Sequence, residues 1–245
     1  MRLPGLTFFF PAYNEEASVA EVVRSALAVL PRYADEIEVV VVDDSSTDRT
    51  GEIADRMAAE EPRVRVVHRR TDRGYGGALR SGISTATLPY VFFTDGDLQF
   101  ALEDLERLLP RLERADIVIG YRERRADPPR RRFIAWVYNR LINVLFLAPF
   151  RDVDCAFKLF RRSVFDRVPL ERIRSNGAFF SPELLLLLRA SGVRMEQVAV
   201  RHYPRRAGEE KGATARVVLR AIRDLLRLRL RLWLQRPALD DQQRP

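Results

Sequence analysis

Short apolar runs alternate with segments of helical periodicity through the first half of this 245-residue chain. The run Ile37–Val42 is continuous and rich in β-branched residues, as strands buried on both faces are. Because strands joined through helices usually pair in parallel, the alternation predicts an α/β fold with an open, mostly parallel sheet between two layers of helices. The predicted strands are Leu6–Phe10, Ile37–Val42, Val64–His68, Leu88–Phe93 and Asp116–Gly120.

Helices are expected between these strands and through the second half of the chain. We expect Arg73–Gly77 to be a flexible loop, and Thr214–Leu234 to be a long basic amphipathic helix. A strand or turn is expected at residues 152–160 and a further strand at residues 197–201. The other predicted helices are Glu16–Leu30, Gly51–Ala59, Ala78–Ser84, Leu102–Leu112, Phe133–Leu147 and Pro182–Ala190.

The length and composition suit one large α/β domain. We expect this domain to cover residues 1–212, followed by the basic helix over residues 213–235 and a frayed tail over residues 236–245. Cys155 is the only cysteine, which excludes an internal disulfide framework and fits a reducing compartment. The most apolar stretch, Phe133–Phe150, contains Asn139, Arg140 and Asn143, which makes it too polar for a lipid-facing span. The N-terminus lacks the pattern of a signal peptide.

The formal net charge of +8 implies an anionic partner. Nucleic acid, an anionic membrane surface and a phosphorylated substrate all satisfy that charge. Against nucleic acid, acidic loops follow the predicted strands and would repel a phosphate backbone. We therefore expect no nucleic-acid partner, and keep a basic nucleic-acid-binding module as the non-enzymatic alternative.

Three polar loops fall at the carboxyl ends of predicted strands, where ligands of open α/β sheets bind. They are Pro11–Glu15, Asp43–Asp48 and Asp95–Gln99. In the third, Asp95 and Asp97 are spaced so that both carboxylates can converge on one hard cation. Mg²⁺ prefers one or two carboxylates together with phosphate oxygens, so the pair suits a metal-bound diphosphate. The structural alternatives are an Asp-Gly turn in the third loop and an Asx turn with a helix N-cap in the second.

The ordered set of these loops resembles family 2 glycosyltransferases of the GT-A fold. The resemblance is carried by Pro11-Ala12-Tyr13-Asn14-Glu15, Val42-Asp43-Asp44-Ser45-Ser46-Thr47-Asp48 and Asp95-Gly96-Asp97. The stretch from Asp152 to Phe160 is similar to one found in the polyprenyl-phosphate branch, which includes dolichyl-phosphate mannosyltransferases and glucosyltransferases. Tyr203-Pro204-Arg205, followed by Gly208 and Lys211, is similar to a basic motif of that branch.

The chain departs from the pattern of that branch at two places. Ala156 stands where the branch usually has glycine, which could alter a close backbone approach. Glu209 and Glu210 precede Lys211 where a serine is common, which bears on phosphate binding by that segment.

The resemblance implies a role for each matching residue. The base and ribose of the donor nucleotide would be bound by Pro11, Tyr13, Glu15 and Asp44. Mg²⁺ or Mn²⁺ would be bound by Asp97, with Asp95 on the metal or the ribose and Gln99 in support. The sugar and acceptor side would be formed by Asp152 and Lys158, and phosphate oxygens would be bound by Arg122, Arg131, Arg205 and Lys211. Arginine suits phosphate because its guanidinium can donate two parallel hydrogen bonds.

The function implied is an inverting transfer of a hexose from a nucleoside-diphosphate sugar to a polyprenyl phosphate. A lipid phosphate is already an anion, so positioning would matter more than a general base. The alternative is transfer to a sugar or polysaccharide hydroxyl, which would need a base. Glu183 is the candidate for that base, and its structural alternative is a residue favoured by the N-terminus of a helix. A non-catalytic member of the family is a further alternative.

A membrane surface is an expected partner. Thr214–Leu234 combines leucines and Trp233 with many arginines, as interfacial helices on anionic lipid do. Packing of this helix on the core, or against another subunit, is the alternative. We expect a cytoplasmic protein, peripheral at the cytoplasmic face of the membrane, of undetermined oligomeric state.

Overall fold

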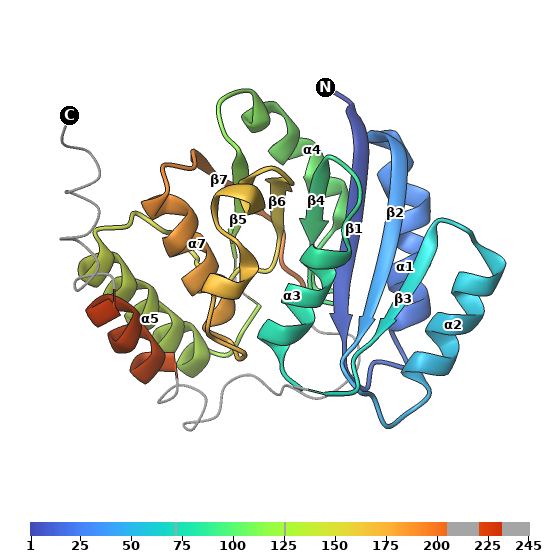
Figure 1. Ribbon diagram of the computed structural model, residues 1–245, viewed down its shortest axis with the longest axis horizontal. Helices are drawn as coiled ribbons and strands as arrows, with labels where there is room; N and C mark the ends of the chain where they lie inside the picture. The colour runs from blue at the N-terminus through green and yellow to red at the C-terminus, as the bar shows by residue number, and fades with distance from the viewer. Residues whose placement is uncertain (72, 125, 205–220, 232–245) are drawn as a thin grey trace.

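A seven-stranded sheet runs through the computed structural model, which describes residues 1–71, 73–124, 126–204 and 221–231 (Figure 1). The strand order is β3-β2-β1-β4-β6-β5-β7. Only β6 is antiparallel to its neighbours, which confirms the predicted mostly parallel α/β fold. The strands are β1 (Leu3–Ala12), β2 (Ala34–Asp43), β3 (Val64–His68), β4 (Tyr90–Phe93), β5 (Ile117–Arg122), β6 (Lys158–Arg161) and β7 (Met195–Val200).

Helices cover both faces of the sheet. The α-helices are α1 (Val19–Val29), α2 (Thr50–Glu60), α3 (Tyr75–Thr85), α4 (Leu105–Leu108), α5 (Pro129–Phe146), α6 (Val164–Arg167) and α7 (Phe180–Ala190), and residues 221–231 are also helical. Short 3₁₀ turns are η1 (Leu30–Arg32), η2 (Leu102–Asp104), η3 (Leu109–Glu113) and η4 (Leu170–Arg172). The predicted domain boundary at residue 212 lies outside the described residues.

The core has two halves because each central strand sends alternate side chains to opposite faces. Phe8 and Phe10 of β1 belong to the half that contains α1, α2 and α4. Phe9, between them, belongs to the half that contains α3, α5 and α7. Strands with two buried faces are mostly apolar along their length, which explains the β-branched run in β2.

Two local predictions were wrong. The helix expected over Leu102–Leu112 is broken into η2, α4 and η3. Pro110 lies in this segment, and proline lacks the amide that an α-helix needs and clashes with the preceding turn. The loop expected over Arg73–Gly77 is already helical from Tyr75, because α3 begins immediately after Gly74.

The described part of the C-terminal helix packs on the protein. Leu225 and Leu228 are buried in the same half of the core as α5 and α7. Leu226 and Leu230 are exposed. One side of helix 221–231 therefore packs on the core, as the core-packing alternative predicts, while another apolar side is exposed to solvent.

We predict that Gly82→Ala destabilises the protein by about 1–3 kcal/mol, because a Cβ there would overlap the fully buried Phe9 ring. Gly177→Ala is the matched control, since a Cβ at Gly177 meets nothing within 4 Å. Urea unfolding of both variants measures the difference. Equal stability of the two variants would contradict the close contact between α3 and β1.

Candidate active site at the carboxyl edge

The loops after β1, β2 and β4 meet at one edge of the sheet because these strands are parallel and in register. Ala12 pairs with Asp43, and Phe9 pairs with Phe93. Each loop contains one non-glycine residue with positive φ, namely Asn14 (53°), Ser45 (62°) and Leu98 (59°). Such a conformation costs about 1–3 kcal/mol and is concentrated at functional sites. The edge, at the bottom of Figure 1, is therefore the candidate active site.

Hydrogen bonds join the first loop to the second. The Asn14 backbone N–H donates to Ser46 Oγ (3.0 Å), and the Glu15 N–H donates to Thr50 Oγ1 (2.8 Å). The side-chain oxygen of Asn14 accepts from the Thr47 N–H at 2.8 Å. The positions of Tyr13 and Glu15 thus depend on the loop that contains Asp44.

The third loop rests directly on β1. Ser18 Oγ donates to the Gly96 carbonyl at 2.9 Å. A Cβ at Gly96 would lie 2.8 Å from Phe10 Cδ2 and 3.0 Å from the Pro11 carbonyl oxygen. Only glycine fits there without displacing β1, so Gly96 sets how closely the two flanking aspartates approach the sheet.

Asp95 and Asp97 are each oriented by a hydrogen bond. The Tyr75 hydroxyl donates to Asp95 Oδ1 at 2.9 Å, and the Gln99 N–H donates to Asp97 Oδ1 at 3.2 Å. Burial raises the pKa of Tyr75 well above its ordinary value, and the charges of Asp95, Asp154 and Asp97 raise it further. Tyr75 therefore stays a neutral donor at physiological pH.

The donor set fits a hard divalent cation. Asp95 and Asp97 provide two carboxylates, and no group of three or more His, Cys, Asp or Glu within the described residues could form a metal cage alone. Mg²⁺ and Mn²⁺ bound in this way complete their coordination with phosphate oxygens and water. The Nε2 of Gln99 donates to the Tyr203 carbonyl at 3.0 Å, and metal binding through its Oε1 stays a prediction.

Asp44 is buried between two partners. Its carboxylate is ion-paired with Arg69 and accepts the Gly74 N–H at 2.9 Å. A Cβ at Gly77 would overlap Arg69 Nη2, so a larger residue there would require the guanidinium to move. The guanidinium of Arg73 lies 5.1 Å from the centre of the Tyr13 ring. Nucleotide binding by Asp44 and Tyr13 stays a prediction.

A buried ion pair occupies the acceptor side of the predicted site. Arg122 donates to both carboxylate oxygens of Asp152, at 2.6 and 2.8 Å. Burial acts to lower the pKa of Arg122, but its contacts with Asp152 outweigh burial and raise that pKa above the ordinary value. Arg131 lies 3.3 Å from Asp127, which is 3.9 Å from Arg122. Arg122 and Arg131 are thus linked to one another through the Asp127 carboxylate.

Lys158 is more buried than its predicted place on the acceptor side implies. It is fully buried, and its amine donates to the Cys155 carbonyl. Burial lowers the pKa of Lys158, while the charges of Asp154, Asp152 and other nearby acids raise it. In this structure the Lys158 amine is held by the Cys155 carbonyl, and its contact with an acceptor stays a prediction.

Asp154 is the site residue that received no predicted role. It is partly exposed, and its charge acts on Tyr75, Arg122 and Lys158. The signal that could have identified it is its spacing from Asp152, which repeats the spacing of Asp95 and Asp97.

Glu183 lies in the first turn of α7 and is buried by structural contacts. It accepts the Ser175 N–H at 2.9 Å and the Ser175 Oγ–H at 2.6 Å, and Arg231 donates to it at 2.6 Å. The carbonyl of Asn176, the residue after Ser175, accepts the Gly76 N–H at 3.0 Å. These contacts favour the structural alternative, and the base role of Glu183 stays a prediction. Arg205 and Lys211 lie outside the described residues.

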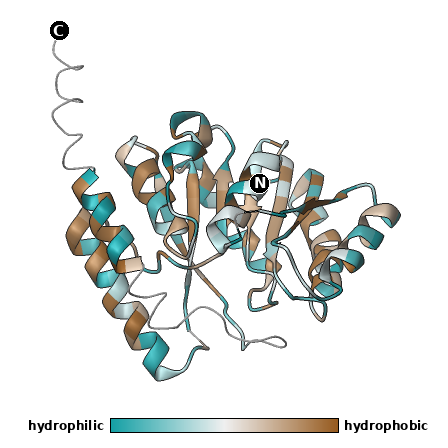
Figure 2. Cartoon of the chain, turned by 60° about the horizontal axis from the view of Figure 1, so that its bottom comes forward, coloured by the Kyte–Doolittle hydropathy of each residue, from teal (hydrophilic) through white to brown (hydrophobic). Residues whose placement is uncertain are grey.

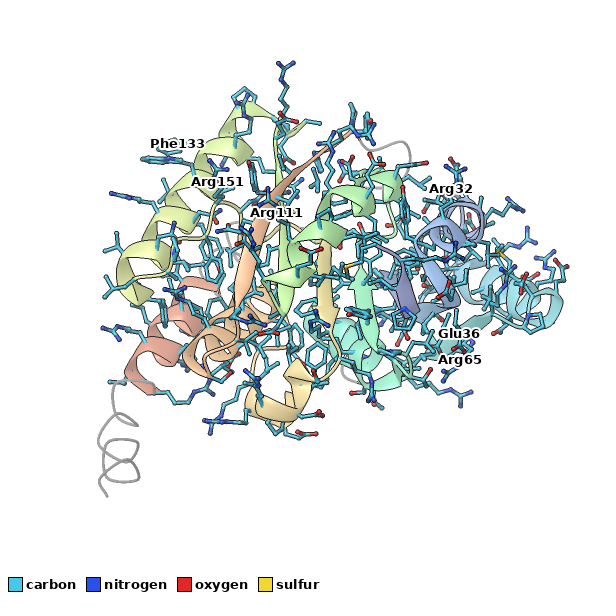
Figure 3. The ribbon with its side chains drawn as sticks, turned by 90° about the horizontal axis from the view of Figure 1, so that it is seen from above. Arg32, Glu36, Arg65, Arg111, Phe133 and Arg151 are labelled. Carbon is cyan, nitrogen blue, oxygen red and sulfur yellow. The ribbon has the colours of Figure 1, made fainter. Side chains whose placement is uncertain are left out.

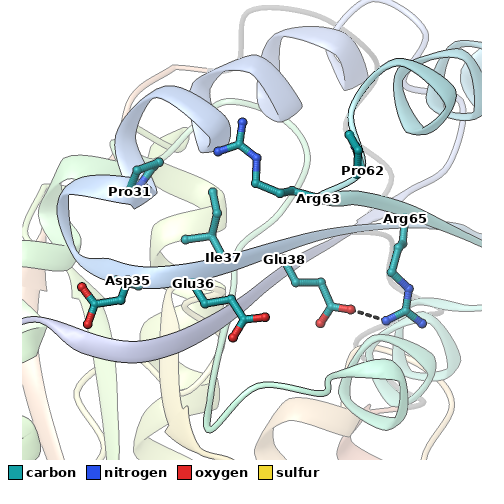
Figure 4. A pocket seen from close by; sticks show the side chains of 9 residues that line it. Pro31, Asp35, Glu36, Ile37, Glu38, Pro62, Arg63 and Arg65 are labelled. Carbon is teal, nitrogen blue, oxygen red and sulfur yellow. Dashed lines mark hydrogen bonds and ion pairs between the residues drawn. The ribbon is translucent and has the colours of Figure 1, made fainter.

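A hollow at the opposite, amino edge contains none of the predicted site residues (Figure 4). Glu38 at its wall accepts hydrogen bonds from Thr7 Oγ1 (2.7 Å) and Thr87 Oγ1 (3.1 Å) and is ion-paired with Arg65. Its carboxylate therefore has a structural role.

Comparison with known proteins supports the residue-based assignment. A sequence model described as "Glycosyl transferase family 2" matches residues 7–168, about two thirds of the chain. The undecaprenyl-phosphate mannosyltransferase of Micrococcus luteus is 30% identical over 209 residues, covering 82% of this chain and 84% of that protein. This chain belongs to glycosyltransferase family 2.

Other relatives are longer than this chain. Glycosyltransferase AglD of Haloferax volcanii is 33% identical over 233 residues, covering 92% of this chain but only 36% of that protein. The dodecaprenyl-phosphate galacturonate synthase of Rhizobium johnstonii is 31% identical, covering 90% of this chain and 65% of that protein. Within the described residues, no helix is long and apolar enough to cross a bilayer.

A solved structure confirms the GT-A fold. Glucosyl-3-phosphoglycerate synthase from Mycobacterium tuberculosis, in complex with Mn²⁺, uridine diphosphate and phosphoglyceric acid, superimposes with a TM-score of 0.69. The match covers 92% of this chain and 78% of that chain, at 22% sequence identity.

His68 connects the second loop to α2. Its Nδ1 lies 3.0 Å from Asp43 Oδ2 and its Nε2 lies 2.9 Å from Asp55 Oδ1. The other Asp43 oxygen accepts the Ser46 N–H at 3.0 Å. The hydrogen bonds to Asp55 and Asp43 raise the pKa of His68 above its ordinary value.

We predict that His68 stabilises the fold most at low pH. Because its pKa is raised by folding, its contribution is complete below the unfolded pKa of about 6.5 and disappears as pH rises through the folded pKa. The difference in free energy of unfolding between wild type and His68→Asn should therefore decrease between pH 5.5 and 9, as measured by urea unfolding. Asp55→Asn should weaken the same dependence. A difference that stays constant or grows with pH would contradict the assignment.

Proposed function

We propose that this protein is an inverting glycosyltransferase that moves a hexose from a nucleoside-diphosphate sugar to a polyprenyl phosphate. The observation that carries this proposal is the place of Asp95-Gly96-Asp97 in the sheet. The strand order puts the loops of β1 and β2 on one side of it and the Arg122–Asp152 pair on the other. One half of the edge is therefore suited to the nucleotide-sugar donor, and the other half is suited to a second anion.

The donor half contains Pro11, Tyr13, Glu15 and Asp44. An aromatic ring can stack on a base, and carboxylates can accept hydrogen bonds from a base or ribose. The hydrogen bonds between the first two loops preorganise these groups, which lowers the entropy lost when the nucleotide binds. Structures of the similar glucosyl-3-phosphoglycerate synthase that contain uridine diphosphate support a nucleotide as ligand of this fold.

Asp95 and Asp97 would hold Mg²⁺ or Mn²⁺, and the ion would neutralise charge on the diphosphate leaving group. Related synthase structures that contain Mn²⁺ or Mg²⁺ together with uridine diphosphate support this assignment. The contribution of this chain is geometric, because Tyr75 and Gly96 fix the direction and depth of the two carboxylates.

The acceptor half provides cations for a phosphate that is already ionised. An acceptor phosphate oxygen forms the new bond to the anomeric carbon as the bond from that carbon to the donor diphosphate breaks. No proton must be removed from such an acceptor, which agrees with a Glu183 occupied by structural contacts. Arg122 and Arg131 are candidate phosphate-binding cations at this half, and Asp152 orients Arg122 with two hydrogen bonds.

The names of the relatives support a lipid phosphate as acceptor. Several act, by name, on undecaprenyl, dodecaprenyl or dolichyl phosphate. We therefore place the protein at the cytoplasmic face of a membrane as a peripheral protein. The buried free thiol of Cys155 is compatible with that reducing compartment.

We predict that the purified protein transfers labelled hexose from a UDP- or GDP-sugar into butanol-extractable lipid when a polyprenyl phosphate and Mg²⁺ or Mn²⁺ are present. The acceptor is anionic without a base, so the matching polyprenol lacking phosphate should accept no label. Scintillation counting of the butanol phase measures both. Label transferred only into water-soluble glycoside would overturn the lipid acceptor, and no transfer from either donor class would overturn the proposal.

A further inference from the structure

An apolar stripe runs along the outer face of α5. The exposed fractions are 64% for Phe133, 64% for Trp136, 44% for Val137, 58% for Val144 and 81% for Leu147, which caps the helix. The spacing of these residues places them within one third of the helix circumference. Large apolar side chains gathered on one exposed face mark an interaction surface, whereas scattered ones do not.

Packing on the part of the chain that the structure describes does not account for this stripe. The opposite side of α5 already packs on the core through buried Asn139 and Ile142 and half-buried Tyr138 and Leu141. Helix 221–231 lies beside α5 at the edge of the molecule farthest from α2 (Figures 1 and 2). In Figure 3, Phe133 lies at the outer rim of the protein, away from the sheet.

Arginines accompany the apolar residues, and acidic residues are absent. Helix α5 contains four arginines and no Asp or Glu. Arg130, Arg132 and Arg140 are exposed, and Arg140 falls within the apolar stripe, four residues before Val144. Arginine can bury its aliphatic stem in an apolar phase while its guanidinium reaches anionic headgroups. Exposed apolar side chains with flanking arginines match the composition of an interfacial helix on anionic lipid.

The N-terminal end of α5 connects the helix to the acceptor half of the candidate active site. Arg131, in the first turn of α5, pairs with Asp127. Asp127 approaches Arg122, which is bound to Asp152 at the carboxyl edge. If α5 lay along a lipid surface, its N-terminal end would therefore lie next to the headgroups. The ion pairs that lead from Arg131 to Asp152 would lie there too.

We propose that the outer face of α5 docks the protein on an anionic bilayer. Phe133 and Trp136 insert among the headgroups, and the arginines pair with lipid phosphates. This changes the sequence-based expectation, in which the C-terminal basic helix provided the membrane surface. Helix 221–231 instead braces α5, with Leu225 and Leu228 directed into the core. The orientation toward the site rests on the proposed lipid acceptor, whereas vesicle binding itself does not require that function.

The test is co-sedimentation of the full chain with vesicles of phosphatidylcholine alone or mixed with phosphatidylglycerol, without donor or acceptor. We expect binding to the mixed vesicles, reduced at least tenfold, as an order of magnitude, by the double variant Phe133→Ser/Trp136→Ser. Arg140→Glu should weaken it roughly tenfold. The matched control is Leu226→Ser/Leu230→Ser, which removes two exposed leucines from the neighbouring helix and should retain most binding.

A second measurement locates the contact. The chain has two tryptophans, so Trp233→Phe leaves Trp136 as the single tryptophan. Its emission should shift to shorter wavelength on mixed vesicles and be quenched by brominated lipid. Circular dichroism and thermal unfolding confirm that the serine variants are folded, and their nucleotide-dependent stabilisation should match that of wild type.

Three outcomes would overturn the proposal. One is no binding of wild type to the mixed vesicles. Another is loss of binding in the Leu226/Leu230 variant but not in the Phe133/Trp136 variant. The third is a concentration-dependent dimer, abolished by the α5 variant, without vesicle binding, which would make the stripe a contact between two copies. Vesicle binding without transfer of label to lipid would instead refute only the proposed function.

Discussion

The parallel register of β1 with β2 and β4 is the constraint on which the candidate site depends. It brings three loops, distant in sequence, to one edge, and each loop then bends through a residue with positive φ. The central phenylalanines of β1 hold that register, because they are buried alternately in the two halves of the core. Because Gly96 has no side chain, the third loop can lie against Phe10 and Pro11, and this contact positions Asp95 and Asp97.

Hydrogen-bond donors lie among the carboxylates of this edge. Tyr75 donates to Asp95, Arg122 donates to Asp152, and the fully buried Lys158 donates to the Cys155 carbonyl. A buried carboxylate without such partners would be costly or would bind a proton. The same groups hold their neighbours in fixed positions, which is the preorganisation that electrostatic stabilisation of a leaving group requires.

Sequence patterns predicted the sheet well where strands are buried on both faces. Val64–His68 has the same bounds in the structure as in the prediction, and the mostly parallel arrangement follows from β-α alternation. The pairing of β6 could not be predicted, because hydrophobic periodicity shows that a strand is present but not which strands it joins. That antiparallel strand starts at Lys158, beside Phe93 at the end of β4, and so buries a residue expected to line the acceptor side.

The sequence also could not predict which side of α5 faces the core. Apolar residues occur on several sides of this helix, so composition cannot decide whether Trp136 or Tyr138 faces the core. The structure decides it by packing Tyr138 inward and leaving Trp136 in solvent. Among the site residues, Asp95, Asp97 and Asp152 followed from motifs, whereas the contacts of Glu183 with Ser175 and Arg231 depend on tertiary packing.

The central claim is that Asp95 and Asp97 bind a nucleotide diphosphate through a divalent cation. The direct measurement is the thermal unfolding temperature with UDP, GDP and their sugars, in the presence and absence of Mn²⁺ or Mg²⁺. In wild type, we predict that nucleotide raises the thermal unfolding temperature only when metal is present. Asp97→Ala should lose this effect. The control Asp35→Ala, which removes an exposed carboxylate at the opposite edge, should retain it. Metal-independent stabilisation, or full stabilisation of Asp97→Ala, would contradict the claim.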